Sequence, residues 1–421
     1  MAASAGGRRP RATAVPGRAL RHERPACDPR RSPLRGRAPG RRARRRRPPP
    51  RRPGGGDRLT ELTLFEAELE LSRPFRIARG TRETLEVLFL RIREGDSTGW
   101  GEAHPAPDVT GETALETREA LASLDPDEVN ALDPASTLAA HEDLGPAARS
   151  ALDLALHDLA GRQADQPVHT LLDLPCGHMP CAGTVTVSDP DDAAEQAREW
   201  LRSGFFHLKV KIEDPEDGLE ATRRVAELLP TDLPDRFPEP EVWVDANEAL
   251  DLDQAQALLT GLDTLGARLV EQPLPRAATA DLAHLAQDAP VPILLDESVQ
   301  SPEDVRAVGR IEGPTMANIK VQKVGGLQAA SACLDAGQAT GTPLVVGCNI
   351  ETGLGIAAGS ALTGAVDRAD LDGNRFLANE PFPLARPRPG FAGTPEGPGL
   401  GAYPDPGKLD ALDKIVSLGT A

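Results

Sequence analysis

The chain has 421 residues and carries 47 Lys and Arg against 64 Asp and Glu, a formal net charge of −17. Residues 1–56 alone hold 18 arginines and two acids, so this arm has a formal charge of +16 while the remaining 365 residues have −33. The body has no apolar run near the roughly 18 residues of a membrane span, and its acidity, with 3% aromatic residues, argues against nucleic-acid binding.

The basic arm and the cysteines give the first expectations. Residues 1–56 lack the apolar periodicity of a folded segment and the apolar core of a secretory signal, so we expect a disordered arm. The arm either binds a polyanion such as nucleic acid or has no function, and the second is favoured because GC-rich coding alone produces arginine without lysine. Five scattered cysteines suit the reducing cytoplasm better than a disulfide framework.

The first folded part of the body, residues 57–175, is predicted to be an α+β module. Strand-like alternation runs from Leu59 to Trp100, with a turn at residues 94–96. Helical spacing of apolar residues follows at 112–124 and again at 146–164. Strands and helices in separate blocks are typical of an α+β domain.

From residue 176 to 385 short apolar strands alternate with helix-length segments. The eight apolar runs end at polar or small residues spaced 22 to 36 apart: Thr184, Lys209, Asp245, Glu271, Asp296, Lys320, Cys348 and Asp370. This repeat predicts a (β/α)8 barrel, in which catalytic groups lie at the C-terminal ends of the strands. A doubly wound open sheet is the alternative, but residues 184–189 lack the Gly-rich phosphate loop that it would need.

Three acids end three successive strands of this predicted barrel: Asp245, Glu271 and Asp296. Adjacent strand ends bring such side chains together, and three carboxylates without a counter-charge repel one another. A hard divalent cation relieves that repulsion, and oxygen ligands favour Mg²⁺ or Mn²⁺ over Zn²⁺. A single acid at a strand end is more often a helix N-cap or a solvated charge, but the near-equal spacing of 26 and 25 residues favours a metal site.

Lysine is rare in this chain, and its positions indicate proton transfer. Of only six lysines, Lys209 and Lys211 end one predicted strand, and Lys320 and Lys323 stand at another. A period of two puts Lys209 and Lys211 on one strand face, where each is expected to lower the pKa of the other. Lys320 ends the strand opposite in the ring. The pattern therefore predicts a base on each side of a substrate carbon, as a two-base 1,1-proton transfer requires.

Together these motifs resemble the enolase superfamily, muconate-lactonizing subgroup. The similar motifs are Lys-x-Lys at 209–211, Asp-x-Asn at 245–247, Glu-Gln-Pro at 271–273, Asp-Glu-Ser at 296–298 and Asn-Ile-Lys-x-x-Lys-x-Gly-Gly at 318–326. The resemblance implies a modified barrel with a capping domain, to which the C-terminal segment returns. We therefore divide the chain into an arm (1–56), a capping domain (57–175), a barrel (176–385) and a returning segment (386–421).

The same resemblance implies a role for each charged group. Mg²⁺ at the three acids would hold a substrate carboxylate. Lys211 and Lys320 would exchange the proton of the adjacent carbon on opposite faces, and Lys209 would help to neutralise the resulting enediolate.

The last two strand ends are similar to those of the dipeptide epimerases, in which an Asp-x-Asp pair grips the substrate ammonium. Asp370 and Asp372 would form this pair on one face of a strand, and Thr184 and Cys348 would contact the substrate. Gly80 stands where L-Ala-L-Glu epimerases carry an arginine, which argues against that particular substrate. Arg79 or Arg82 either replaces this arginine or is a salt-bridged surface residue.

The sequence thus predicts a cytoplasmic, homo-oligomeric, Mg²⁺-dependent dipeptide epimerase that inverts the α-carbon of the C-terminal residue. The enzymatic alternatives on this scaffold are cycloisomerases, N-succinylamino-acid racemases and o-succinylbenzoate synthases, whose substrates lack a free ammonium. The non-enzymatic alternative is a polyanion-binding protein that acts through residues 1–56. Two neighbouring side chains are expected to lie outside the site: Glu297 facing away from the metal, and His207 on the strand face opposite the lysines, against a helix.

Overall fold

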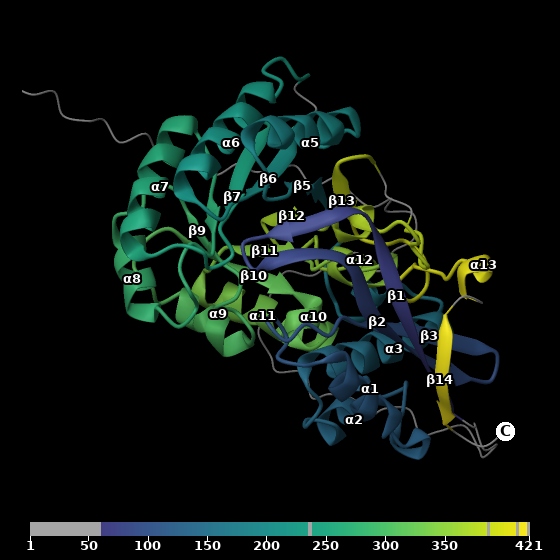
Figure 1. Ribbon diagram of the computed structural model, residues 1–421. Helices are drawn as coiled ribbons and strands as arrows, with labels where there is room; N and C mark the ends of the chain where they lie inside the picture. The colour runs from purple at the N-terminus through teal and green to yellow at the C-terminus, as the bar shows by residue number, and fades with distance from the viewer. Residues whose placement is uncertain (1–59, 235–237, 385–387, 410–411, 419–421) are drawn as a thin grey trace, which may run out of the picture. The chain divides into compact units, whose positions relative to one another are not determined.

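The computed structural model describes residues 60–234, 238–384, 388–409 and 412–418. The arm predicted at residues 1–56 lies outside these ranges. Within them, Figure 1 shows an antiparallel sheet with its helices and, beside it, a ring of parallel strands surrounded by helices.

The antiparallel sheet combines both ends of the described chain. Across the sheet its strands are β14 (Asp413–Leu418), β1 (Thr60–Ile77), β2 (Gly80–Glu94) and β3 (Ser97–Ala103). Its helices are α1 (Ala114–Ala122), η2 (Pro126–Glu128), α2 (Pro134–Ala140), α3 (Pro146–Ala164) and α4 (Val168–Leu171). Helix α3 packs closely on β3, because a Cβ atom at Gly101 would lie 1.8 Å from the carbonyl oxygen of Ala151. This small residue therefore lets the helix lie directly on the sheet.

The second part is a barrel of eight parallel strands, as predicted. In order around the sheet they are β5 (Ala182–Val185), β6 (His207–Lys211), β7 (Glu241–Asp245), β8 (Val270–Glu271), β9 (Ile293–Leu295), β10 (Thr315–Lys320), β11 (Leu344–Gly347) and β12 (Arg368–Asp370). A parallel bridge between Cys181 and Ala369 joins the two ends of the sheet. The (β/α)8 prediction is confirmed.

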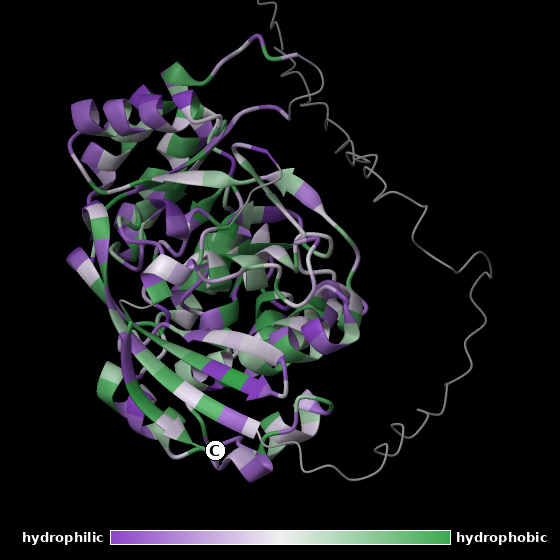
Figure 2. Cartoon of the chain, turned by 90° about the vertical axis from the view of Figure 1, so that its right-hand side faces the viewer, coloured by the Kyte–Doolittle hydropathy of each residue, from purple (hydrophilic) through white to green (hydrophobic). Residues whose placement is uncertain are grey.

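The helices that connect the barrel strands start at strong sequence signals. These helices are α5 (Pro190–Arg202), α6 (Pro215–Leu228), α7 (Leu252–Leu265), α8 (Thr279–Gln287), α9 (Pro302–Val308), α10 (Val321–Val324), α11 (Leu327–Thr340) and α12 (Gly353–Ser360). Three of them begin at the proline of an Asp-Pro or Ser-Pro pair. The residue before that proline caps the helix N-terminus, and these caps are Asp189, Asp214 and Ser301. In Figure 2 hydrophilic colour dominates the outer helices and hydrophobic colour the central segments, as a barrel packed inside a ring of amphipathic helices requires.

The strands are buried on both faces. On β7, Val242 and Val244 belong to the large cluster that packs against the helices, while Trp243 belongs to a small separate cluster from the other face. That small cluster fills the barrel interior and consists of Ala182, Trp243, Leu269, Leu294, Met316 and Val345. A filled interior leaves only the strand ends free to form a site.

The structure corrects some predicted details. The first barrel strand ends at Val185, one residue after Thr184. The last ends at Asp370, so that Asp372 lies at the start of the 3₁₀ helix η3 (Gly373–Phe376). A two-stranded sheet that was not predicted joins β4 (His178–Pro180) to β13 (Phe391–Gly393). Strand β14 pairs with β1 and follows the short helix α13 (Pro406–Leu409). The domain boundaries themselves stay predictions. Among the described residues no helix is long and apolar enough to cross a membrane.

Candidate active site

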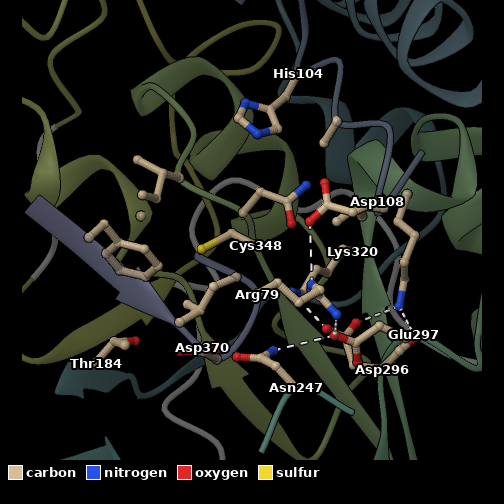
Figure 3. A pocket seen from close by; sticks show the side chains of 18 of the residues that line it. Arg79, His104, Asp108, Thr184, Asn247, Asp296, Glu297, Lys320, Cys348 and Asp370 are labelled. Atoms are coloured by element: carbon tan, nitrogen blue, oxygen red, sulfur yellow. Dashed lines mark hydrogen bonds and ion pairs between the residues drawn. The ribbon is translucent and has the colours of Figure 1, made fainter. Parts of the chain in front are cut away.

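A pocket lies where the C-terminal ends of the barrel strands meet the capping sheet and its loops (Figure 3). The barrel contributes Thr184, Lys209, Lys211, Asn247, Asp296, Glu297, Lys320, Lys323, Cys348, Asn349, Ile350, Asp370 and Asp372. The capping domain contributes Phe75, Ile77, Arg79, Arg82, Leu85, His104, Ala106, Asp108 and Val109. Predicted site residues at the ends of six different strands therefore line one pocket, whereas Asp245 and Glu271 are not among its lining residues.

Lys209 and Lys211 project from the same face of β6, as predicted, and share one carboxylate. The Nζ of Lys211 lies 2.7 Å from Asp245 Oδ2 and 3.0 Å from Asn247 Oδ1, and the Nζ of Lys209 lies 3.6 Å from the same Asp245 oxygen. Lys209 also pairs with Asp370, and its Nζ lies 3.4 Å from Glu271 Oε2. The two ammonium groups thus join the ends of β7, β8 and β12.

The predicted lowering of the Lys209 pKa is wrong for this arrangement. Burial alone would lower that pKa, but the negative charges of Asp370, Glu271 and Asp245 outweigh burial and raise it. The carboxylates dominate because they are in direct contact with the Lys209 ammonium.

Asp296 is held from two sides by lysines of the next strand end. Its Oδ2 lies 2.8 Å from Lys320 Nζ, while the Lys323 ammonium donates to its Oδ1 and to its backbone carbonyl. Burial would raise the pKa of Asp296, but Lys320 and Lys323 lower it. Lys323 is 1% exposed, so its charge acts as a fixed part of the barrel and not as a surface group.

Among the three predicted metal ligands, Glu271 is the one whose pKa is raised. Burial, followed by repulsion from Asp245, raises its pKa to about 8, and Asp296 contributes in the same direction. Its Oε1 accepts a hydrogen bond of 2.8 Å from Asn318. Glu271 is thus close enough to Asp245 and Asp296 to be affected by both charges.

This donor set fits a hard cation in its chemistry. Three buried carboxylates repel one another and disfavour ionisation of Glu271, and a divalent cation would relieve both effects. Among the described residues, however, no three His, Cys, Asp or Glu side chains are already arranged as metal ligands, because lysines hold several of the carboxylate oxygens. The three acids are brought together, and their role as ligands stays a prediction.

The two acids of the predicted ammonium clamp have separate partners. Asp370 pairs with Lys209 through Oδ2, whereas its buried Oδ1 has no hydrogen-bond partner in the described part of the chain. Asp372 lies beyond the strand, and its Oδ2 accepts a 2.6 Å hydrogen bond from the backbone of Thr184. Burial and then Asp370 raise the pKa of Asp372 to about 6. The expectation that both acids share a strand face is therefore wrong, although both line the pocket with Thr184 and Cys348.

Arg79 links the capping domain to the barrel across the pocket. Its Nη1 lies 2.7 Å from Glu297 Oε1 and 3.1 Å from Glu248 Oε2, and its Nε lies 3.3 Å from Asp108 Oδ2. Arg82 pairs with the same Asp108, at 3.1 Å. Glu297 lines the pocket and pairs with this guanidinium, and its orientation relative to a metal stays a prediction.

The expectation for His207 is also wrong. A period of two puts His207 on the same face as Lys209, and the structure places its ring edge-on to Trp243, with centroids 6.4 Å apart. Its Nε2 lies 3.2 Å from the carbonyl oxygen of Glu239. His207 therefore faces the barrel interior, away from the pocket end.

Several pocket residues received no role from the sequence, among them His104, Asn349 and Lys323. His104 follows β3 directly, and Lys323 lies three residues beyond Lys320. The scarcity of lysine was a usable signal for Lys323. His104 had no such signal, because its position depends on how the capping sheet meets the barrel.

The comparisons with known proteins agree with this architecture. A family model described as "Mandelate racemase / muconate lactonizing enzyme, N-terminal domain" matches residues 59–173, and one described as "Enolase C-terminal domain-like" matches residues 192–408. The chain therefore belongs to the enolase superfamily, and the resemblance seen in its motifs is confirmed.

Several similar proteins are named dipeptide epimerases. The L-Ala-D/L-Glu epimerase of Escherichia coli (strain K12) is 34% identical over 75% of this chain and 94% of its own length. The hydrophobic dipeptide epimerase of Flavobacteria bacterium (strain MS024-2A) is 30% identical over 82% and 98%. The solved dipeptide epimerase from Methylococcus capsulatus, complexed with Mg and L-Arg-D-Lys, is 31% identical, with a TM-score of 0.72 over 82% of this chain and 99% of that one.

Proposed function

We propose that this protein is a Mg²⁺-dependent dipeptide epimerase that inverts the α-carbon of the C-terminal residue. The observation that carries the proposal is the placement of Lys211 and Lys320 at the ends of β6 and β10, with three strands between them in either direction around the barrel. The names of the similar proteins support the reaction and the substrate class.

Asp245, Glu271 and Asp296 would hold the metal. When bound there, Mg²⁺ supplies positive charge that offsets the negative charge growing on the substrate carboxylate as the α-proton leaves. The lysines that now contact these acids belong to the same network and can turn to the substrate when the acids bind a cation.

The lysines of the pocket would carry the proton. A substrate α-carbon between Lys211 and Lys320 presents one face to each, so one lysine removes the proton and the other delivers a proton from the opposite side. Lys209, which is buried two residues before Lys211 on β6, supplies a fixed positive charge beside the enediolate. Phe75, 6.0 Å from Lys211 Nζ at its ring centroid, helps to exclude water there.

The free ammonium of the dipeptide would bind at Asp370. This carboxylate has one oxygen on Lys209 and another, buried, with no partner among the described residues. A substrate ammonium can donate to that oxygen. A substrate without a free amine would leave this buried oxygen of Asp370 unsatisfied.

Deuterium exchange tests the proposal. The protein with Mg²⁺ and a panel of dipeptides in D₂O should place deuterium at the C-terminal α-carbon, which NMR detects, and N-acetylation should strongly reduce this exchange. Equal exchange of N-acylated amino acids would instead favour an N-succinylamino-acid racemase. A complete absence of exchange across the panel would refute the epimerase.

A further inference from the structure

We propose that His104 and Asn349 form a subsite that hydrogen-bonds an uncharged polar group of the substrate's N-terminal residue. The inference rests on the proposed function, which fixes how a dipeptide must lie. The group recognised is neutral and hydrogen-bonding, and it is either the peptide carbonyl of that residue or its side chain.

The two residues offer unused polar atoms to the pocket. His104 is 3% exposed and lines the pocket, and its Nδ1 is buried without a hydrogen-bond partner in the described ranges. Asn349 also lines the pocket, and its Nδ2 is likewise buried without a partner in these ranges. Because an unsatisfied buried polar atom costs free energy, two such atoms on residues that line one cavity indicate a ligand that completes them.

Both residues are held in place through their backbones. Gln322, from the barrel, accepts from the His104 backbone N–H at 3.1 Å and donates to the Glu102 carbonyl at 2.8 Å. The backbone N–H of Asn349 donates to Glu351 at 2.8 Å. These backbone contacts position His104 and Asn349 while the side-chain atoms His104 Nδ1 and Asn349 Nδ2 stay available for a ligand, as a preorganised binding site requires.

The charge state of His104 suits a neutral group. Burial lowers the pKa of this imidazole to about 4, and Arg82 and Lys320 contribute in the same direction against Asp108. The ring is therefore uncharged at neutral pH. Figure 3 shows it entering the pocket from the capping domain, on the side where Cys348 and Lys320 lie.

The strand order places this pair along the path of the dipeptide. The reacting carbon lies between Lys211 and Lys320, and the ammonium lies at Asp370 on β12. Strand β11, whose end leads into Asn349, lies between β10 and β12. The N-terminal residue must pass the end of β11 to connect the two points, and there it meets Asn349 and His104.

Substrate pairs of equal shape test the subsite. We would measure kcat/KM by α-deuterium exchange for dipeptides that share a C-terminal residue and start with Thr or Val, using the wild type, His104→Phe and Asn349→Leu. If the side chain is recognised, the wild type prefers Thr by about tenfold and both variants lose that preference. If the carbonyl is recognised, kcat/KM for both substrates falls by about tenfold in both variants.

Controls separate a lost contact from a lost fold. His104→Gln keeps a hydrogen-bonding group and should restore part of the lost kcat/KM. His169→Phe removes a buried imidazole that does not line this pocket, and it should leave kcat/KM unchanged for both substrates. Wild-type exchange with unchanged kcat/KM in His104→Phe and Asn349→Leu would overturn the subsite alone. No exchange by the wild type would refute the proposed function and the subsite with it.

Discussion

The barrel side and the capping side of the pocket are built differently. On the barrel side four lysines face four buried acids at the strand ends. Lys209 and Lys211 contact acids of three other strands, and Lys320 and Lys323 contact Asp296. On the capping side one guanidinium, that of Arg79, contacts Asp108, Glu248 and Glu297, and a neutral His104 stands nearby. The barrel side therefore suits charge and proton transfer, whereas the capping side suits recognition of the variable parts of a substrate.

The strongest test of the barrel side is Lys320→Ala. In a two-base reaction each lysine serves one face of the α-carbon, so we expect exchange from one epimer to fall by about 100-fold or more while the other epimer keeps its exchange. The measurement is deuterium incorporation from the L,L- and L,D-dipeptides separately. Lys408→Ala, which changes an exposed lysine outside the pocket, is the control. Equal loss for both epimers would show that Lys320 does not act on one face alone.

The sequence predicted the barrel side far better than the capping side. A strand has a period of two and a barrel repeats its units, so the ends of β6, β7, β8 and β10 could be placed from apolar runs alone. Asp372 was misplaced because a short strand gives a weak signal. Glu297 and His104 depend on contacts such as His104–Gln322, which joins residues 218 positions apart, and one sequence does not contain that information.

Arg79→Met tests the capping side. We expect KM to rise by about tenfold with a smaller effect on kcat, because the variant loses charge-assisted hydrogen bonds that hold the β1–β2 turn over the pocket but leaves the lysines in place. Steady-state kinetics on the best dipeptide separate the two constants. Arg73→Met removes an ion pair to Glu199 outside the pocket and is the matched control. If both variants behave alike, Arg79 has no special part in closing the site.

Glu351→Gln tests the contact between the barrel and the capping domain at two buried carboxylates. Glu351, from the barrel, lies close to Glu102 of the capping domain, since a Cβ on Gly355 would meet both carboxylates. Burial and then repulsion from Glu102 raise the pKa of Glu351 to about 8.

The sign of the resulting pH dependence follows from this shift. Between pH of about 4.5 and 8 the unfolded chain releases the Glu351 proton while the folded chain keeps it, so the free energy of unfolding falls as pH rises, by at most about 1.4 kcal/mol per pH unit. Glu351→Gln should flatten this fall in urea unfolding at pH 5 to 8, and Glu119→Gln, at an exposed position on α1, should not. An unchanged slope would mean that Glu351 is ionised in the folded protein.

The smallest expected effect is that of deleting residues 1–56. The pocket residues identified in the structure run from Phe75 to Phe376, so both of its sides are built without the arm. We therefore expect unchanged kcat and KM in the shortened protein, measured by the same exchange assay. If the arm binds polyanions, only the full-length chain should bind heparin, with turnover still unchanged. A large loss of turnover would mean that a third, basic region contributes to the site, and a comparison of two sides would no longer describe it.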